Sequence, residues 1–172
     1  LRARGRAVTA GVVVVGLNHR TAPVEARERL AVPPEGLEDA ARAVAALEGV
    51  REAVVIATCN RVELYAMGDE TSAVAAELRR HLQARGGAGV TLYEHRGEAA
   101  VRHAFRVCAS LDSLVVGEPQ ILGQLKQAFR SAQEIGTVGP VLGALLPTAF
   151  AVAKRVRSET AIGENPASVA SV

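Results

Sequence analysis

The amino-acid sequence predicts an α+β fold in which a four-stranded antiparallel sheet is followed by a helical extension. Between residues 12 and 95, apolar residues follow strand-like and helix-like spacings in alternation. The second and third strand-like segments are separated by only a few residues, a connection that antiparallel strands allow and parallel strands do not. From residue 101 to about residue 159 the spacing is helical throughout.

The first predicted strand is a continuous apolar run from Val12 to Leu17, a pattern that is typical of a buried strand. Apolar residues then recur at helical spacing from Leu37 to Leu47, after the pair Pro33-Pro34 and before Gly49. The short apolar run Ala53–Ala57 predicts a second buried strand.

Residues 61–67 alternate, with Val62, Leu64 and Ala66 on one face and Arg61, Glu63, Tyr65 and Met67 on the other. A helix carrying Val74, Leu78 and Leu82 follows, and residues 90–95 form a weaker fourth strand. Right-handed crossovers convert this order into a ferredoxin-like βαββαβ sandwich, with its helices on one face of the sheet.

The second half carries three helical patterns. The first is an apolar stripe of Val101, Ala104, Phe105, Cys108 and Leu111. The second runs from Ile121 to Ala132 in a helix that Pro119 can open, and the third covers residues 141–159. We therefore expect one domain over residues 1–160, with residues 161–172 as a linker that leads into a further domain.

The composition narrows the class of protein. The 172 residues are 49% hydrophobic and 22% charged, which favours a soluble globule over a disordered chain. Only 3% are aromatic, so a base-stacking platform is not expected, and a net charge of +2 does not select a polyanionic partner. No membrane span or signal peptide is recognisable, so we expect a cytoplasmic protein.

Two cysteines occur without a CxxC or Cys/His spacing, so neither a disulfide framework nor a metal site is predicted. Cys59 lies in the segment Thr58-Cys59-Asn60-Arg61, which joins two strands and should place the thiol at a sheet end. A cation such as Arg61 favours the thiolate form of a nearby cysteine, which is the nucleophilic form. From spacing alone, a packed or incidental cysteine remains the alternative. Cys108 falls on an apolar stripe and is interpreted as structural.

His103 lies off that stripe, beside Arg102 and Arg106, which indicates either an exposed histidine or a general acid or base facing Cys59 across a cleft. The segment Gly117-Glu118-Pro119-Gln120 opens a helix, whose N-terminal N–H groups suit a carboxylate or are simply capped by Glu118. No strand is followed by a GxGxxG or GxxxxGK[ST] loop, so no dinucleotide is expected to bind this chain.

Four segments, in order along almost the whole chain, resemble the N-terminal domain of glutamyl-tRNA reductase. They are GLNHRTAP at 16–23, TCNRVELY at 58–65, LDSLVVGEPQILGQ at 111–124 and AKRVRSET at 153–160. The resemblance implies that Cys59 is the nucleophile and that His103 is a second catalytic residue. It also implies a substrate pocket for glutamate, formed by Thr58, Asn60, Arg61, Ser113, Glu118, Pro119, Gln120 and Gln124.

The same resemblance implies an activity. Cys59 would attack the ester of glutamyl-tRNA to form a thioester, which NADPH reduces to glutamate-1-semialdehyde, the first step of five-carbon tetrapyrrole and 5-aminolevulinate biosynthesis. NADPH is expected to bind a domain outside this chain, so that the chain alone is at most a weak glutamyl-tRNA esterase. The longer protein is expected to be a homodimer, and glutamate-1-semialdehyde aminotransferase is a further expected partner. The rival hypotheses are a non-catalytic tRNA- or protein-binding module and a stand-alone thiol hydrolase.

Overall fold

A sheet of four strands in the order β2-β3-β1-β4 forms the centre of the computed structural model, which describes residues 11–113, 120–160 and 162. The strands are β1 (Val12–Asn18), β2 (Glu52–Thr58), β3 (Arg61–Met67) and β4 (Tyr93–Arg96), and each neighbouring pair is antiparallel. The predicted α+β class and the four-stranded antiparallel sheet are therefore confirmed.

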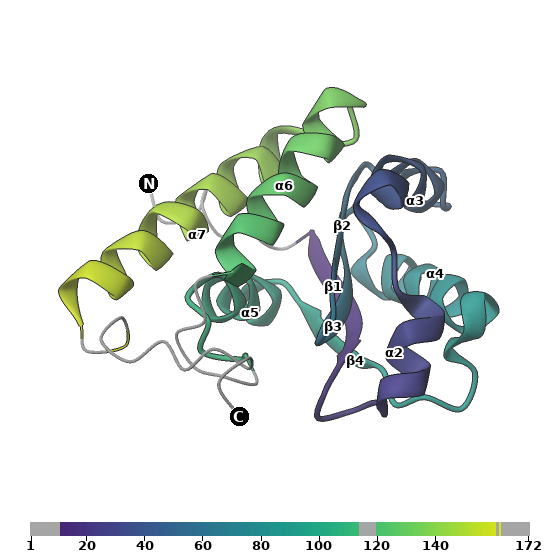
Figure 1. Ribbon diagram of the computed structural model, residues 1–172. Coiled ribbons are helices and arrows are strands. Elements are labelled where there is room, and N and C mark those ends of the chain that lie inside the picture. Colours follow the sequence, from purple (N-terminus) through teal and green to yellow (C-terminus); the bar gives the residue numbers. More distant parts are fainter. Residues whose placement is uncertain (1–10, 114–119, 161, 163–172) are drawn as a thin grey trace.

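Helices cover both faces of this sheet (Figure 1). On one face lie α2 (Val24–Leu30), α3 (Leu37–Ala45) and α4 (Thr71–Leu82), with the short helical turns η1 (Pro34–Gly36) and η2 (Gln83–Gly87) in the connections. On the other lie α5 (Glu98–Cys108), α6 (Gln120–Glu134) and α7 (Pro140–Glu159). The expectation of helices on one face holds for the first half of the chain only, because the helical extension folds back over the opposite face.

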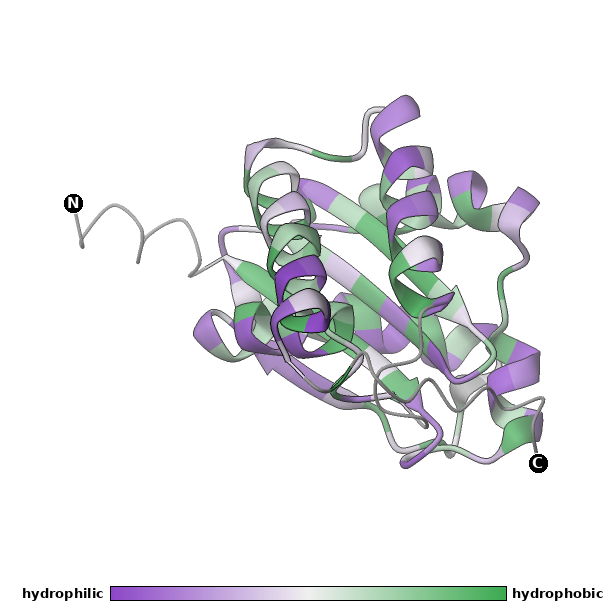
Figure 2. Cartoon of the chain, turned by 60° about the vertical axis from the view of Figure 1, so that its left-hand side comes forward, coloured by the Kyte–Doolittle hydropathy of each residue, from purple (hydrophilic) through white to green (hydrophobic). Residues whose placement is uncertain are grey.

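The alternation of side chains along each strand builds two separate cores. Val13, Val15 and Leu64 face α2, α3 and α4, whereas Val14 and Tyr65 face α5, α6 and α7. The central strands contain long hydrophobic stretches, whereas hydrophobic and hydrophilic residues mix along the helices, as Figure 2 shows. Since both faces are covered, the central strands bury every residue from Val12 to Asn18 and from Arg61 to Ala66.

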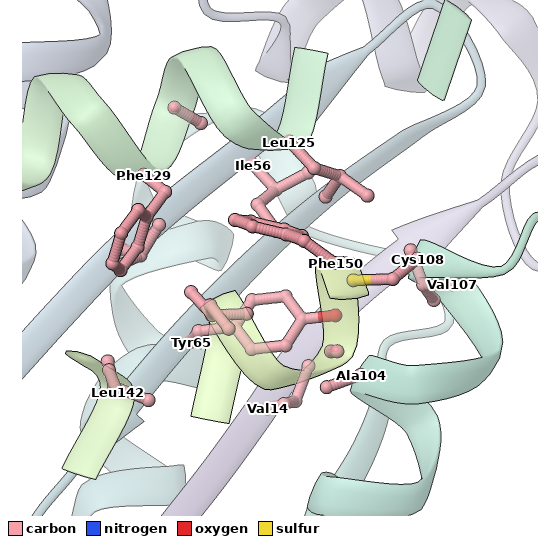
Figure 3. Packing of buried hydrophobic residues seen from close by; sticks show 14 of the residues in the cluster. Val14, Ile56, Tyr65, Ala104, Val107, Cys108, Leu125, Phe129, Leu142 and Phe150 are labelled. Atoms are coloured by element: carbon pink, nitrogen blue, oxygen red, sulfur yellow. The ribbon is translucent and has the colours of Figure 1, made fainter. Parts of the chain in front are cut away.

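Cys108 belongs to the second core, as predicted. Its sulfur points into the apolar cluster around Phe150 and Tyr65 in Figure 3, and its side chain is 2% exposed. Burial, with a smaller contribution from the negative charge of Glu63, raises the pKa of this thiol to about 12. A neutral, packed thiol behaves as a small hydrophobic residue, which is a structural role.

A buried carboxylate joins the helical extension to the sheet. Glu52, on edge strand β2, is 4% exposed and accepts hydrogen bonds from the backbone N–H groups of Val141 (3.0 Å) and Leu142 (2.7 Å) at the start of α7. The first N–H groups of a helix have no partner within the helix, and an acidic group there also interacts favourably with the helix dipole. Glu52 thus caps a helix that lies almost ninety residues further along the chain.

Two elements differ from the prediction. Helix α2 was not predicted, because its seven residues bury only Ala26 and Leu30 and are too few to show a periodic pattern. Strand β4 begins at Tyr93 rather than Val90. The apolar residue Leu92 precedes it and packs into the first core from outside the strand.

Candidate active site

Cys59 lies in a two-residue turn between β2 and β3, where Thr58 pairs with Arg61 in the sheet register. The Thr58 hydroxyl accepts hydrogen bonds from the backbone N–H groups of Asn60 and Arg61, both at 3.2 Å. Ser and Thr hydroxyls stabilise turns in this way. The thiol of Cys59 is exposed at the end of the sheet, as the sequence predicts.

Two segments from the first face brace this turn. Arg27, on α2, donates from Nη1 to the carbonyl oxygen of Cys59 and to the side-chain oxygen of Asn60, the latter at 3.2 Å. The backbone N–H of His19, in the loop after β1, donates to the carbonyl oxygen of Asn60 at 3.0 Å. Arg27 was missed from the sequence because the helix that carries it was missed.

A narrow pocket opens beside the turn, and its walls come from the turn, from the segment after α5 and from the first residues of α6. The lining residues are Thr58, Cys59, Asn60, Arg61, Ser113, Gln120, Ile121 and Gln124. Two buried polar atoms in these walls, Nε of Arg61 and Oγ of Ser113, have no hydrogen-bond partner within the described part of the chain. Buried polar groups are nearly always paired, so these two atoms indicate a place for a polar ligand or for water.

The guanidinium of Arg61 is fully buried and bound from inside the protein. Nη1 donates to Glu63 at 2.7 Å, and Nη2 donates to the carbonyl oxygen of Asp112. Arg61 is the cation that the sequence placed near Cys59, and in the structure its charge is paired with that of Glu63. A second guanidinium, that of Arg27, lies beside the turn and donates to the carbonyl oxygen of Cys59. This residue was not identified from the sequence.

Glu63 is the centre of a buried polar network. Its carboxylate accepts hydrogen bonds from Arg61, from Tyr93 (2.5 Å) and Tyr65 (2.8 Å), and bonds Nε2 of His103 at 2.8 Å. Burial alone would raise the pKa of Glu63, but the Arg61 charge and the hydrogen bonds from His103 and Tyr93 outweigh it, so that this pKa lies well below its ordinary value. Burial and the Glu63 charge raise the pKa of both tyrosines. Glu63 is therefore ionised and the tyrosines are neutral near pH 7.

His103 is not exposed, contrary to one of the two sequence interpretations. Its exposed fraction is 7%, because the buried face of α5 consists of Ala100, His103, Ala104, Val107 and Cys108. The apolar stripe predicted for this helix is therefore displaced by about one residue around the helix from the face that is buried in the structure. The spacing i, i+3, i+4, i+7, i+8 over these five positions is the signal that places the histidine on the buried side.

Two further cavities flank the network and the turn. One, of about 620 Å³, is lined by His95, whose ring stacks on that of His103 at 4.4 Å, and by charged residues that pair with one another, among them Arg106 with Asp112 and Arg102 with Glu98. The other, of about 400 Å³, borders Cys59 and is mainly apolar. His103 lines the first of these cavities, whereas Cys59 lines the second and the narrow pocket.

Residues 15–160 match the family model described as the N-terminal domain of glutamyl-tRNA(Glu) reductase, a match that covers most of the chain. The chain belongs to this family. It is 51% identical to the glutamyl-tRNA reductase of Geobacter sulfurreducens over 163 residues, which are 92% of this chain and 38% of the relative. It is 48% identical to glutamyl-tRNA reductase 2 of Koribacter versatilis over 161 residues, again 92% of this chain and 37% of the relative.

A solved structure of glutamyl-tRNA reductase from Methanopyrus kandleri has the same fold. It superposes with a TM-score of 0.71 at 34% sequence identity, over 88% of this chain and 35% of that one. The chain thus spans little more than a third of the length of these reductases.

Seven of the ten site residues implied by the reductase resemblance lie together around the narrow pocket: Thr58, Cys59, Asn60, Arg61, Ser113, Gln120 and Gln124. His103 does not line the pocket: its Nε2 bonds Glu63, which in turn bonds Arg61, and its Nδ1 lies 3.9 Å from the carboxylate of Asp112. Glu118 and Pro119 lie outside the described residues. Among the residues that are described, no cluster of three His, Cys, Asp or Glu side chains suits a metal ion, and no helix is both long and apolar enough to cross a bilayer.

Proposed function

We propose that this domain carries out the acyl-transfer step of glutamyl-tRNA reduction, with Cys59 as the nucleophile. The Cys59 thiolate attacks the carbonyl carbon of the ester that joins glutamate to the 3′ end of tRNA. A carbon–sulfur bond forms and the carbon–oxygen bond to the terminal ribose breaks. The ribose oxygen takes up a proton and leaves as a hydroxyl, so that the products are a glutamyl thioester and free tRNA.

The observation that carries this proposal is the pair of unpartnered polar atoms beside an exposed thiol. Nε of Arg61 and Oγ of Ser113 are held in the wall of the pocket that Cys59 borders. A guanidinium N–H is a strong donor to a carboxylate, and a hydroxyl both donates and accepts. We assign to these two residues the polar groups of the glutamyl moiety. Thr58, Asn60, Gln120 and Gln124, together with Glu118 and Pro119, complete the proposed pocket.

We assign His103 a positioning role. Its Nε2 is bound to Glu63, and Glu63 in turn binds Arg61, so the histidine helps to fix the guanidinium that faces the substrate. Since His103 lines a different cavity from Cys59, orientation accounts for its geometry better than direct proton transfer to the thiol does.

The hydride that would reduce the thioester to glutamate-1-semialdehyde is proposed to come from NADPH bound by another part of a longer protein. In support of this proposal, the glycines at positions 86, 87 and 89 follow α4 instead of joining a strand to the start of a helix, as a dinucleotide-binding turn does.

The wider assignment follows from the same proposal. The strand order and antiparallel pairing support a ferredoxin-like βαββαβ sandwich for residues 12–96 within a catalytic domain of residues 1–160, and residues 161–172 are assigned to the linker toward the NADPH-binding domain. The longer protein is proposed to act in the cytoplasm, where its tRNA substrate is charged, at the start of tetrapyrrole synthesis. A homodimer and a contact with glutamate-1-semialdehyde aminotransferase are parts of this proposal.

A single-turnover reaction tests the chemistry. The 172-residue chain in excess over glutamyl-tRNA should release free tRNA and gain a glutamyl group on Cys59, seen by mass spectrometry after an acid quench. Cys59→Ser should abolish the thioester, while the matched variant Cys108→Ser should retain it, because Cys108 is a buried core residue. A glutamyl adduct on Cys108 would reverse the assignment.

Two other results would point to other functions. Binding of tRNA without any acylation of Cys59 would indicate a non-catalytic binding module. Fast multiple turnover without NADPH would indicate a thiol hydrolase. Formation of semialdehyde by this chain with NADPH alone would overturn the proposal that the cofactor binds elsewhere.

A further inference from the structure

The arginines near the β2–β3 turn differ in whether a carboxylate offsets their charge. Arg61 is paired with Glu63 at 2.7 Å, and Arg20, in the loop after β1, lies 3.8 Å from the carboxylate of Asp112. Arg27 takes part in none of the ion pairs that form within the described part of the chain. Among the residues that the structure describes, no carboxylate therefore offsets the charge of Arg27.

The groups that bind Arg27 are neutral. Its Nη1 donates to the carbonyl oxygen of Cys59 and, at 3.2 Å, to the side-chain oxygen of Asn60. Its Nε is buried and has no hydrogen-bond partner among the described residues. A carbonyl and an amide orient a guanidinium without cancelling its charge, and an arginine is not deprotonated in proteins. The charge of Arg27 is thus fixed at the turn and remains available to act on other groups there.

The thiol of Cys59 lies within reach of this charge. Its sulfur belongs to the same residue as the carbonyl that Arg27 binds, so the two groups are well within the screening length of about 10 Å at about 0.1 M salt. The neighbouring His19 does not add a second charge. Burial and the charges of the surrounding arginines lower the pKa of His19 below its ordinary value, so that its imidazole is neutral near pH 7.

We infer that Arg27 is a positioning residue for the nucleophile: it orients the turn that presents Cys59 and supplies an uncompensated positive charge that acts on the sulfur. This inference rests on the proposed function. In the acyl transfer, the attacking sulfur is anionic, and the carbonyl oxygen of the ester gains negative charge as the carbon–sulfur bond forms. A cation that is already fixed beside the turn stabilises both charged states without having to reorient during the reaction.

Two alkylating reagents of similar size measure the charge at the sulfur. Iodoacetate is anionic and iodoacetamide is neutral, so the ratio of their second-order rate constants with Cys59 reports the local field and not the exposure of the thiol. The same ratio for N-acetylcysteinamide, an uncharged small thiol, corrects for intrinsic reactivity. Arg27→Gln removes the charge but keeps an N–H donor, and Arg27→Lys keeps the charge. The matched control is Arg29→Gln, because Arg29 lies on the same helix and contacts Gly86 instead of the turn.

We expect the corrected ratio to fall about threefold in Arg27→Gln, since two unit charges about 6 Å apart in water attract each other by about that factor. Arg27→Lys should retain most of the wild-type ratio, and Arg29→Gln should leave it unchanged. Salt at about 1 M, which shortens the screening length to about 3 Å, should bring the wild-type ratio close to that of Arg27→Gln. An equal ratio in the wild type and in Arg27→Gln would overturn the inference. If circular dichroism shows that Arg27→Gln does not fold, a wild-type ratio that does not respond to salt would overturn it.

Acylation by glutamyl-tRNA separates this inference from the function on which it rests. At saturating glutamyl-tRNA, the single-turnover rate constant for acylation of Cys59 should also fall about threefold or more in Arg27→Gln and recover in Arg27→Lys. If the wild type is not acylated, the proposed function is wrong, and the alkylation ratio still decides whether the charge of Arg27 acts on the sulfur. If acylation proceeds in Arg27→Gln at the wild-type rate, the inference is wrong and the nucleophile stands.

Discussion

Replacing Glu63 by Gln isolates the charge at the centre of the buried network. The two side chains have nearly the same shape, but glutamine leaves the fully buried guanidinium of Arg61 without a counter-charge. The hydroxyls of Tyr65 and Tyr93 can rotate and accept a hydrogen bond from the new amide, whereas Arg61 has donors only. The main cost of Glu63→Gln is therefore the uncompensated cation.

Breaking a buried ion pair by removing one partner costs about 3–5 kcal/mol. In a protein of this size each kcal/mol shifts the melting temperature by about 2–4 °C, so a fall of roughly 6–20 °C is expected. Urea unfolding followed by circular dichroism measures the free energy directly. The matched control is Glu94→Gln, whose carboxylate is partly exposed, bonds Arg79 at 3.1 Å and also bonds Arg96; it should cost about 1 kcal/mol or less.

A loss of under about 1 kcal/mol in Glu63→Gln, no larger than in Glu94→Gln, would refute this reasoning. It would mean that water or a rearranged partner reaches Arg61 and that the network does not fix the guanidinium. The proposed positioning role of His103 would then lose its basis as well, because it acts through the same carboxylate.

Three further outcomes are expected. Arg27→Ala should lower the unfolding free energy by about 1–3 kcal/mol in urea titrations, since it removes hydrogen bonds to the Cys59 turn, while Arg29→Ala loses only a 3.5 Å contact and should change it less. Iodoacetamide should label Cys59 alone in the folded chain, and label Cys108 only in denaturant, as read by peptide mass spectrometry; equal labelling would contradict the buried thiol. Because the pKa of Glu63 is lowered in the folded state, its carboxylate stabilises the fold at pH values above the unfolded carboxyl pKa of about 4.3, and this contribution is lost as the pH falls below that value. Glu63→Gln should therefore reduce the fall in unfolding free energy between neutral and acidic pH. An unchanged dependence of unfolding free energy on pH would contradict the lowered pKa.

The strands were predictable because covered strands leave strong local patterns. The runs at residues 12–17 and 53–57 are apolar throughout, and β3 was predicted over the same residues that it occupies. The turn that exposes Cys59 followed from the closeness of two strands. Each of these features depends on neighbours in the sequence, which is the information that periodicity contains.

The polar network was not predictable in the same way. The alternation in β3 placed Arg61 and Glu63 together on one face, and a charged strand face normally indicates solvent. Whether that face is buried depends on α5, which begins more than thirty residues after Glu63 and brings His103 onto it. Similarly, Arg27 reaches the turn from a helix that buries only two residues, so the sequence contained no periodic signal for it.

Burying the polar groups around Glu63 costs free energy, but it also fixes the position of Arg61 beside the pocket. Four polar groups around Glu63 are desolvated where an apolar core would be at least as stable, because buried ion pairs seldom gain net free energy over well-packed hydrophobic residues. What the arrangement provides is position. Glu63 and the Asp112 carbonyl occupy Nη1 and Nη2 of Arg61, and its buried Nε has no hydrogen-bond partner within the described part of the chain. A guanidinium fixed from behind requires no reordering when a carboxylate arrives, and a donor fixed in place before the substrate binds loses less entropy on binding. On the proposed function, β3, which follows the Cys59 turn, also carries the Arg61 and Glu63 pair that we assign to orienting the substrate.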